Sequence, residues 1–381
     1  MDQTKHFGIL DHWRIDALKA FRFLLTSLFF MGMFSIHASA QRPDDSAELL
    51  KTEADQARVQ GNVTQAIDLY TKAVQLDSAW PDGWWYLGSL QYATNAYGPA
   101  VTALTHYIDL VPKAGPAFAL RGLCEFEQKQ YPKSLQDLQQ AIALGAANQP
   151  KNAGILFYHE ALLLTMFGRY EEALTTYGNM LKHGMASDEI IDGIGLAVLR
   201  LPMLPYEVDV KRSSQVFEAG KAAASILNDQ IDAGGQEFEA FFREYPTLPN
   251  VHYSFGYLLS VAEPDAAIAQ MQKELAIVPS SAIAHSMLAW ILGTQGKYDE
   301  ALVDAQKAVA ENPSLVMAQL VLGQDLVETD NLQDALPHLN AVLSADPRNL
   351  DAHLALAKAY SEMGRKEDAR RERLLCLTLT R

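Results

Sequence analysis

Apolar side chains recur at helical spacing along most of the chain. In the segment AIAHSMLAWILGTQG, Ile283, Leu288, Ile291 and Leu292 recur at three, four and five residues until Gly296 interrupts the pattern. The segment that follows, YDEALVDAQKAVAENP, repeats this spacing and ends at a proline. Because helices show this period, the pattern predicts pairs of short amphipathic helices joined by tight turns.

Small residues mark the period of the helix pair. Two series of anchor residues follow a 34-residue spacing, Ala66, Ala100 and Ser134 in one, and Ala267, Ala301, Ala335 and Ala369 in the other, with Ala173 between them. A second small residue lies 12 positions before most anchors, at Ala54, Gly88, Gly122, Ala161, Ala289, Gly323 and Ala357. We expect the paired small residues to let the two helices approach, since larger side chains would overfill the contact at a cost of about 1–3 kcal/mol.

One segment carries a family resemblance most clearly. In DGWWYLGSLQYATNAYGPAVTALTHYIDLVP, Trp84, Leu87, Gly88, Ala100 and Pro112 stand where the tetratricopeptide repeat family places tryptophan, leucine, glycine, alanine and proline. The chain also resembles a group of exported bacterial tetratricopeptide proteins. The resemblance implies an all-α fold, a right-handed α-solenoid of helix–turn–helix repeats whose first helices line a concave surface.

The anchors predict two arrays of repeats separated by an irregular segment. The N-terminal array covers 47–187, with repeats at 47–80, 81–114, 115–148 and 154–187. Segment 188–214 lacks anchors, and we expect an unpaired helix there up to about Arg200, followed by a link through Pro202 and Pro205. The C-terminal array covers 215–381, with repeats at 215–248, 249–281, 282–315, 316–349 and 350–381.

The N-terminal segment has the pattern of a signal peptide. Lys19 and Arg22 precede an apolar run over 23–36, and Ala38-Ser39-Ala40 offers a small-residue cleavage site. The run is shorter than the roughly 20 residues of a spanning helix. We therefore expect a signal peptide over 1–40, cleaved after Ala40, and a periplasmic or secreted protein. A retained anchor in the inner membrane is the alternative, and membrane contact is expected only in that case.

Net charge narrows the classes of expected partner, and the positions of the cysteines argue against a disulfide. The formal net charge is −15, and such a surface repels phosphate backbones and anionic lipids, so nucleic acid is not an expected partner. The two cysteines, Cys124 and Cys376, lie far apart in an extended array. We expect two buried free thiols rather than a disulfide.

The histidines do not form a metal-binding pattern. His252, His285 and His353 share one repeat position, so an array separates them, and packing against the neighbouring hairpin is the favoured interpretation. The segment YHEALLL lacks the second histidine of a zinc-binding helix. We expect no metal site and no cofactor.

No stretch of the chain has the pattern of a catalytic site. The irregular segment supplies Glu207, Asp209 and Lys211, but three charges in a loop are typical of a solvated surface. We therefore expect a non-enzymatic protein.

The first helices carry aromatic residues on the face that the family uses as a groove. The predicted partner-binding residues are Trp85, Tyr92, Phe126, Tyr158, Tyr253, Tyr257, Trp290 and Gln324. Aromatic side chains with few fixed charges suit an extended peptide or an amphipathic helix, so we expect a scaffold for a protein or peptide partner. A platform for glycan or peptidoglycan fragments is the alternative, and a third interpretation is that the rings only fill the array. The oligomeric state stays open.

The leader gives the first testable prediction. N-terminal sequencing of the exported protein should begin at Gln41, because the A-x-A site ends at Ala40. Exported material that begins at Met1 would contradict cleavage and favour the retained anchor.

Overall fold

The computed structural model describes residues 43–148 and 150–379, and the predicted leader over 1–40 lies outside them. Within these residues the regular structure consists of nineteen α-helices and two short 3₁₀ segments, without a strand. The structure confirms the predicted all-α solenoid. No helix in the described part is long and apolar enough to cross a membrane.

The chain divides into two compact units. Unit 1 runs to Met180 and also contains Leu204–Val208, while unit 2 contains Leu181–Met203 and the chain from Asp209 onward. The irregular segment predicted from the sequence, 188–214, is divided between the units. Leu204–Val208 belongs to unit 1, and the rest of the segment belongs to unit 2.

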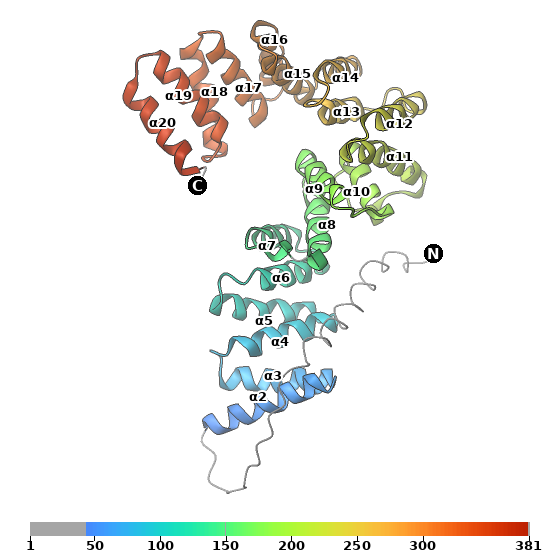
Figure 1. Ribbon diagram of the computed structural model, residues 1–381, viewed down its shortest axis with the longest axis vertical. Coiled ribbons are helices and arrows are strands. Elements are labelled where there is room, and N and C mark those ends of the chain that lie inside the picture. Colours follow the sequence, from blue (N-terminus) through green and yellow to red (C-terminus); the bar gives the residue numbers. More distant parts are fainter. Residues whose placement is uncertain (1–42, 149, 380–381) are drawn as a thin grey trace. The chain divides into compact units, whose positions relative to one another are not determined.

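Unit 1 is a stack of helix pairs (Figure 1). Each second helix also contacts the first helix of the next pair, as α3 contacts α4 and α5 contacts α6. The pairing of neighbours buries faces that single short helices would leave exposed. The helices are α2 (Pro43–Val59), α3 (Val63–Leu76), α4 (Pro81–Ala93), α5 (Tyr97–Leu110), α6 (Gly115–Glu127), α7 (Tyr131–Ala143), α8 (Pro150–Met166) and α9 (Tyr170–Lys182), whose last residues enter unit 2.

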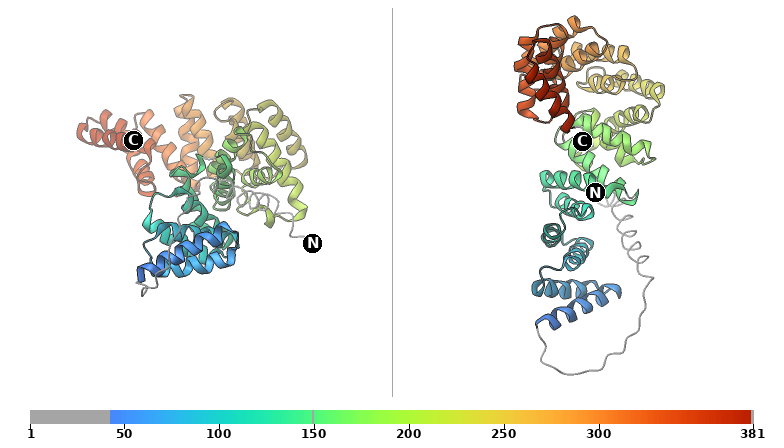
Figure 2. Two further views of the ribbon diagram at one scale, coloured as in Figure 1. Left: turned by 60° about the horizontal axis from the view of Figure 1, so that its bottom comes forward. Right: turned by 60° about the vertical axis from the view of Figure 1, so that its left-hand side comes forward.

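Unit 2 repeats this stacking over a longer stretch (Figure 2). Neighbouring first helices also touch directly, because α17 contacts both α15 and α19. The helices are α10 (Asp188–Val198), α11 (Val210–Leu227), α12 (Ile231–Glu244), α13 (Val251–Leu259), α14 (Pro264–Ile277), α15 (Ala282–Thr294), α16 (Tyr298–Glu311), α17 (Val316–Glu328), α18 (Leu332–Ala345), α19 (Leu350–Glu362) and α20 (Lys366–Leu379).

The predicted small residues lie where the two helices of a pair touch. Ala301 has no exposed surface. A Cβ atom added at Gly88 would lie 2.8 Å from Cγ of Leu104, and one added at Gly323 would lie 2.7 Å from Cγ of Leu339. The contact therefore leaves no room for a side chain, which confirms the predicted role of these positions.

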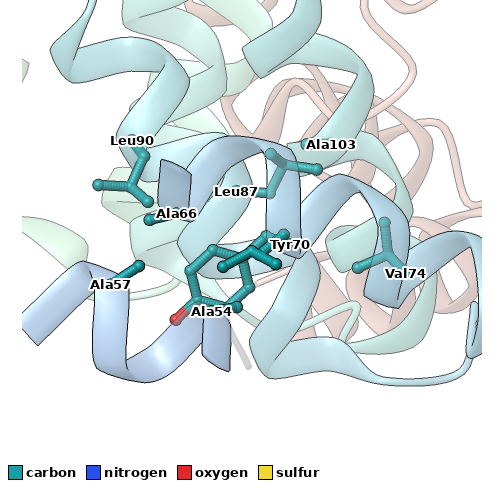
Figure 3. Close-up of a cluster of buried hydrophobic side chains, with 9 residues drawn as sticks. Ala54, Ala57, Ala66, Tyr70, Val74, Leu87, Leu90 and Ala103 are labelled. Atoms are coloured by element: carbon teal, nitrogen blue, oxygen red, sulfur yellow. The ribbon is translucent and has the colours of Figure 1, made fainter. Parts of the chain in front are cut away.

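Side chains of neighbouring pairs meet in continuous apolar clusters. Figure 3 shows the cluster between the first two pairs, in which Tyr70 of α3 packs with Ala54, Leu87 and Leu90. Tyr70 is fully buried, and its hydroxyl donates a hydrogen bond to Asp55, so the ring is buried without leaving its polar atom unpaired. Clusters of this kind join one repeat to the next.

A residue in the left-handed region ends the first helix of most pairs. The φ angle is 74° at Gly296, 62° at Asp330 and 74° at Gly364, and these positions follow one another at the 34-residue period. Glycine adopts this conformation freely, and aspartate tolerates it better than most residues. The tight turn between the two helices is therefore a repeated feature of the pairs.

The helix predicted to be unpaired has a close partner. In the structure α10 packs against α11, so that prediction is wrong. A Cβ atom added at Gly195 would lie 1.9 Å from the carbonyl oxygen of Val216, and one added at Gly220 would lie 2.0 Å from that of Ile191. Two glycines thus let the two backbones touch, but they lie outside the 34-residue phase and give no anchor signal.

The repeated histidines bind within their own helix pair. His285 contacts Asp304 of α16 through Nδ1 at 2.7 Å, and His353 contacts Glu372 of α20 in the same way at 2.7 Å. The Nε2 atom of each ring lies 3.1 Å from the carbonyl oxygen of the preceding loop proline. The shared position is thus explained by contacts with the second helix of the same pair and with the preceding loop, rather than by packing against the neighbouring hairpin alone. Both cysteines are buried and neither forms a disulfide, as predicted.

The α10–α11 crossing gives a stability prediction. Gly220→Ala should lower the free energy of unfolding by roughly 1–3 kcal/mol, because the new methyl group collides with a backbone carbonyl that cannot move aside. Gly235→Ala in α12 is the matched control, because a Cβ atom there meets nothing within 4 Å, and it should stabilise the helix by up to about 1 kcal/mol. Urea unfolding followed by circular dichroism measures both, and equal midpoints for the two variants would contradict the role of the crossing.

Candidate functional site

All eight predicted partner-binding residues lie on the first helices of their pairs, including α13, which pairs with α14. In unit 1, α4 carries Trp85 and Tyr92, α6 carries Phe126, and α8 carries Tyr158. In unit 2, α13 carries two tyrosines, Tyr253 and Tyr257, while α15 carries Trp290 and α17 carries Gln324.

The aromatic residues of unit 1 are half-buried and contact other rings. The ring centroids of Trp85 and Tyr107 are 5.4 Å apart, and those of Phe126 and His159 are 4.7 Å apart in an edge-to-face arrangement. Tyr158 also meets His159, with centroids 5.7 Å apart. These contacts hold the rings within the array, and their use by a partner stays a prediction.

The two tyrosines of α13 differ in how much surface they offer. Tyr253 is only 5% exposed, and the guanidinium of Arg200 lies 5.0 Å from the centre of its ring. Tyr257 is half-buried. A partner could reach far more of Tyr257 than of Tyr253.

Trp290 and Gln324 lie together in a hollow of unit 2. The hollow has a volume of about 360 Å³ and is formed by three successive first helices, α15, α17 and α19, together with Tyr298 at the start of α16. We call it the Asp325 hollow, after the residue that distinguishes it. Its lining includes Trp290, Gly293, Gln324, Asp325, Asp351 and Lys358.

A missing side chain helps to open the hollow. Gly293 lies eight residues before its anchor, at the repeat position that carries Tyr92 and Phe126 in unit 1. A Cβ atom at this position would lie 3.0 Å from Oδ1 of Asp325, which is tighter than most real contacts. Gly293 therefore leaves the space beside the carboxyl group unfilled.

Asp325 is an acid at a core position of the repeat. The equivalent residue, ten before the anchor, is apolar and buried in five other repeats, at Leu90, Cys124, Leu163, Ile291 and Ala359, whereas the first repeat has the exposed Gln56 there. Only 3% of Asp325 is exposed, and its Oδ2 atom has no hydrogen-bond partner among the described residues. A buried polar atom without a partner costs free energy, so packing does not account for an acid here.

Burial also changes the acidity of this group. Loss of hydration, together with the charge of Glu328, raises the pKa of Asp325 to about 7. The carboxyl group thus changes charge close to neutral pH.

The mouth of the hollow carries further charges. Lys358 of α19 forms an ion pair with Glu328 of α17, with Nζ and Oε2 2.5 Å apart. Asp351 of α19 contributes another carboxylate, and Lys358 alone is basic among the lining residues. The lining therefore carries more negative than positive charge.

A second buried acid, in unit 1, lies beside an ion pair, although its Oε2 atom also has no hydrogen-bond partner among the described residues. Glu125 of α6 is 4% exposed, and burial together with the charge of Asp137 raises its pKa to about 7. Asp137 is itself held by two hydrogen bonds from Arg121, at 2.6 and 2.9 Å. Glu125 thus belongs to a charged network between α6 and α7, whereas Asp325 faces a hollow.

Sequence reasoning missed three residues of this site, Gly293, Asp325 and Lys358. Aligning the repeats position by position would have shown Asp325 as the acid at a position that is mostly apolar, and Gly293 as a glycine where every other repeat has a side chain. Lys358 gives no such signal, because its role depends on the distance to Glu328 across two helices.

The site lacks the donors of a metal centre. Among the residues that the structure describes, no group of three or more histidine, cysteine, aspartate or glutamate side chains could hold a metal ion. The chemistry of the hollow is that of one unpaired carboxyl group beside an indole ring.

Comparisons with known proteins agree with the repeat period. Models of the tetratricopeptide repeat family match residues 51–115, 257–315 and 326–372. No curated protein matches the sequence.

Among solved structures, those of MamA are similar to part of the chain. One MamA crystal structure is 18% identical, covers 42% of this chain and 94% of its own, and gives a TM-score of 0.38. A double mutant of MamA from RS-1 is 16% identical, covers 43% of this chain and 92% of its own, and gives a TM-score of 0.39. Another MamA structure is 14% identical, covers 71% of this chain and 93% of its own, and gives a TM-score of 0.30.

The raised pKa of Asp325 predicts how stability depends on pH. The folded pKa of about 7 lies above the ordinary value of 3.8, so the folded state favours the neutral acid, and stability falls as pH rises from 3.8 through 7. Asp325→Asn has no charge to desolvate, so its advantage over the wild type should grow by roughly 2–3 kcal/mol between pH 5 and pH 8, at about 1.4 kcal/mol per pKa unit.

Urea unfolding of the wild type and Asp325→Asn at the two pH values measures this difference. The comparison between variants cancels the titration of groups that they share, including Glu125. An advantage of equal size at both pH values would show that Asp325 does not titrate in this range.

Proposed function

The chain is a tetratricopeptide repeat protein, from a family that generally serves to bind protein partners, and we propose that it is an exported, non-enzymatic scaffold that binds a protein partner along its first helices. The observation that carries the proposal is the Asp325 hollow, where Trp290 and Gln324 lie on one surface formed by three successive repeats. The predicted leader over 1–40 supports export.

The geometry favours binding of an extended segment. The hollow crosses α15, α17 and α19, so a bound chain that follows it meets one repeat after another. A half-buried tryptophan in a concave surface is the kind of residue that dominates binding energy at protein interfaces. Recognition then rests on a rigid surface rather than on a chemical step.

The aromatic residues of unit 1 form a second proposed binding surface. Trp85, Tyr92, Phe126 and Tyr158 follow one another on α4, α6 and α8 at equivalent faces of the repeat. A partner that contacts both units would gain affinity from the combined contacts, even where each one is weak.

Site-specific crosslinking in the producing cells tests the proposal. A benzoylphenylalanine residue placed at Gln324 should form a defined protein adduct, whereas the same residue at the exposed Glu311 of α16 should not, because that position lies outside the hollow. Trp290→Ala should lower the adduct yield at 324 by about tenfold or more, which corresponds to about 1.4 kcal/mol of binding free energy.

The double variant Trp85→Ala with Trp290→Ala tests the extent of the surface. Its adduct yield should fall below that of Trp290→Ala alone if unit 1 contributes contacts. A yield in the double variant equal to that of the wild type would show that the predicted aromatic residues on the first helices do not contribute to binding.

A further inference from the structure

The Asp325 hollow contains a buried carboxyl group whose surroundings do not satisfy it. Oδ2 of Asp325 has no hydrogen-bond partner among the described residues, although 97% of the residue is covered. None of the other aligned repeats places an acid at this position, and five of them bury an apolar side chain there, so the fold does not require an acid. A group that lowers stability and lies beside an open volume is a candidate for ligand binding.

We infer that the Asp325 hollow binds a basic side chain, an arginine guanidinium or a lysine ammonium group, presented by an extended segment of the partner protein. This inference rests on the proposed function and specifies the chemistry of the partner. Asp325 accepts hydrogen bonds from the cation, and the indole ring of Trp290, in the same lining, offers an aromatic face for it.

The charges around the hollow favour a cation. Glu328 and Lys358 neutralise each other in an ion pair, which leaves the carboxyl groups of Asp325 and Asp351 as the remaining charges of the lining. An anionic segment would meet these two carboxyl groups, and a neutral one would leave Asp325 unpaired. The net negative charge of the whole chain also attracts basic partners.

Gly293 controls access to the carboxyl group. Oδ1 of Asp325 lies 3.0 Å from the place where a Cβ atom at position 293 would stand. Gly293→Ala therefore narrows the approach from the hollow without changing any charge. This variant separates access to Asp325 from the charge of Asp325.

Isothermal titration calorimetry with short peptides tests the inference. The probes are acetyl-Leu-Arg-Leu-amide, its lysine analogue, and its citrulline analogue, which keeps the shape of arginine but carries no charge. At pH 8 the full-length protein should bind the arginine peptide at least about tenfold more tightly than the citrulline peptide. Equal affinities, or no saturable binding of the basic peptides up to millimolar concentration, would overturn the inference.

Three variants assign the preference to the hollow. Asp325→Asn should abolish the preference for arginine over citrulline, and Gly293→Ala should reduce it strongly. Glu311→Gln removes one negative charge from an exposed position outside the hollow and should retain the preference. Circular dichroism confirms that each variant is folded, and a preference that survives in Asp325→Asn would refute the assignment.

The preference should depend on pH in a defined direction. Burial and Glu328 raise the pKa of Asp325 to about 7, so the carboxylate that binds the cation is present above this value and is lost as pH falls toward 5. The other titratable groups in the lining are Tyr298 from α16, Glu328 on the same helix, and Asp351 and Lys358 from α19, while α15 contributes none. Binding of arginine that is equally tight at pH 5.5 and pH 8 would contradict the role of Asp325.

The outcome can be separated from that of the proposed function. If Trp290→Ala abolishes the crosslinked adduct while arginine and citrulline peptides bind alike, the first-helix surface binds a partner of different chemistry. If the arginine preference holds but the adduct is unaffected by Trp290→Ala, the hollow binds cations and the partner surface lies elsewhere.

Discussion

The close contact between the two helices of each pair is the constraint on which the rest of the structure depends. Helices of 13 or 14 residues, such as α15 and α16, are marginally stable alone. They become stable because small residues such as Ala301 and Gly323 let the paired backbones approach and because neighbouring pairs then share their apolar faces. Where the phase is lost, between α10 and α11, two glycines restore the same kind of contact.

This constraint acts on one side of each first helix and leaves other positions free to vary. Tyr92, Phe126 and Gly293 share one of these positions, and the change from a ring to a hydrogen atom opens space in unit 2. In the next repeat, an acid replaces the apolar residue that packs at the equivalent position. The Asp325 hollow thus results from two departures in adjacent repeats, each of which is visible only against the period that the other repeats keep.

The sequence predicts what the period determines and misses what depends on contacts between helices. The helix pairs, the buried anchors and the packing of His285 and His353 follow from spacing alone. The pairing of α10 with α11 does not, because Gly195 and Gly220 lie on either side of a long link and carry no periodic mark. Among the eight predicted site residues, only Trp290 and Gln324 line the hollow, because it forms where α15, α17 and α19 come together and spacing alone does not show that.

The array explains why such an acid is tolerated. In a stack of repeats each helix gains its stability from its neighbours, so the cost of desolvating Asp325 falls on the contacts of α17 with α15 and α19. The contacts of α17 with α16 and α18 add to its stability, because each repeat in a stack interacts with its neighbours. A compact core would spread the same cost over its whole packing. A bound cation would return part of this free energy, because its charge stabilises the buried carboxylate, so the cost in the free protein becomes a source of selectivity for basic groups.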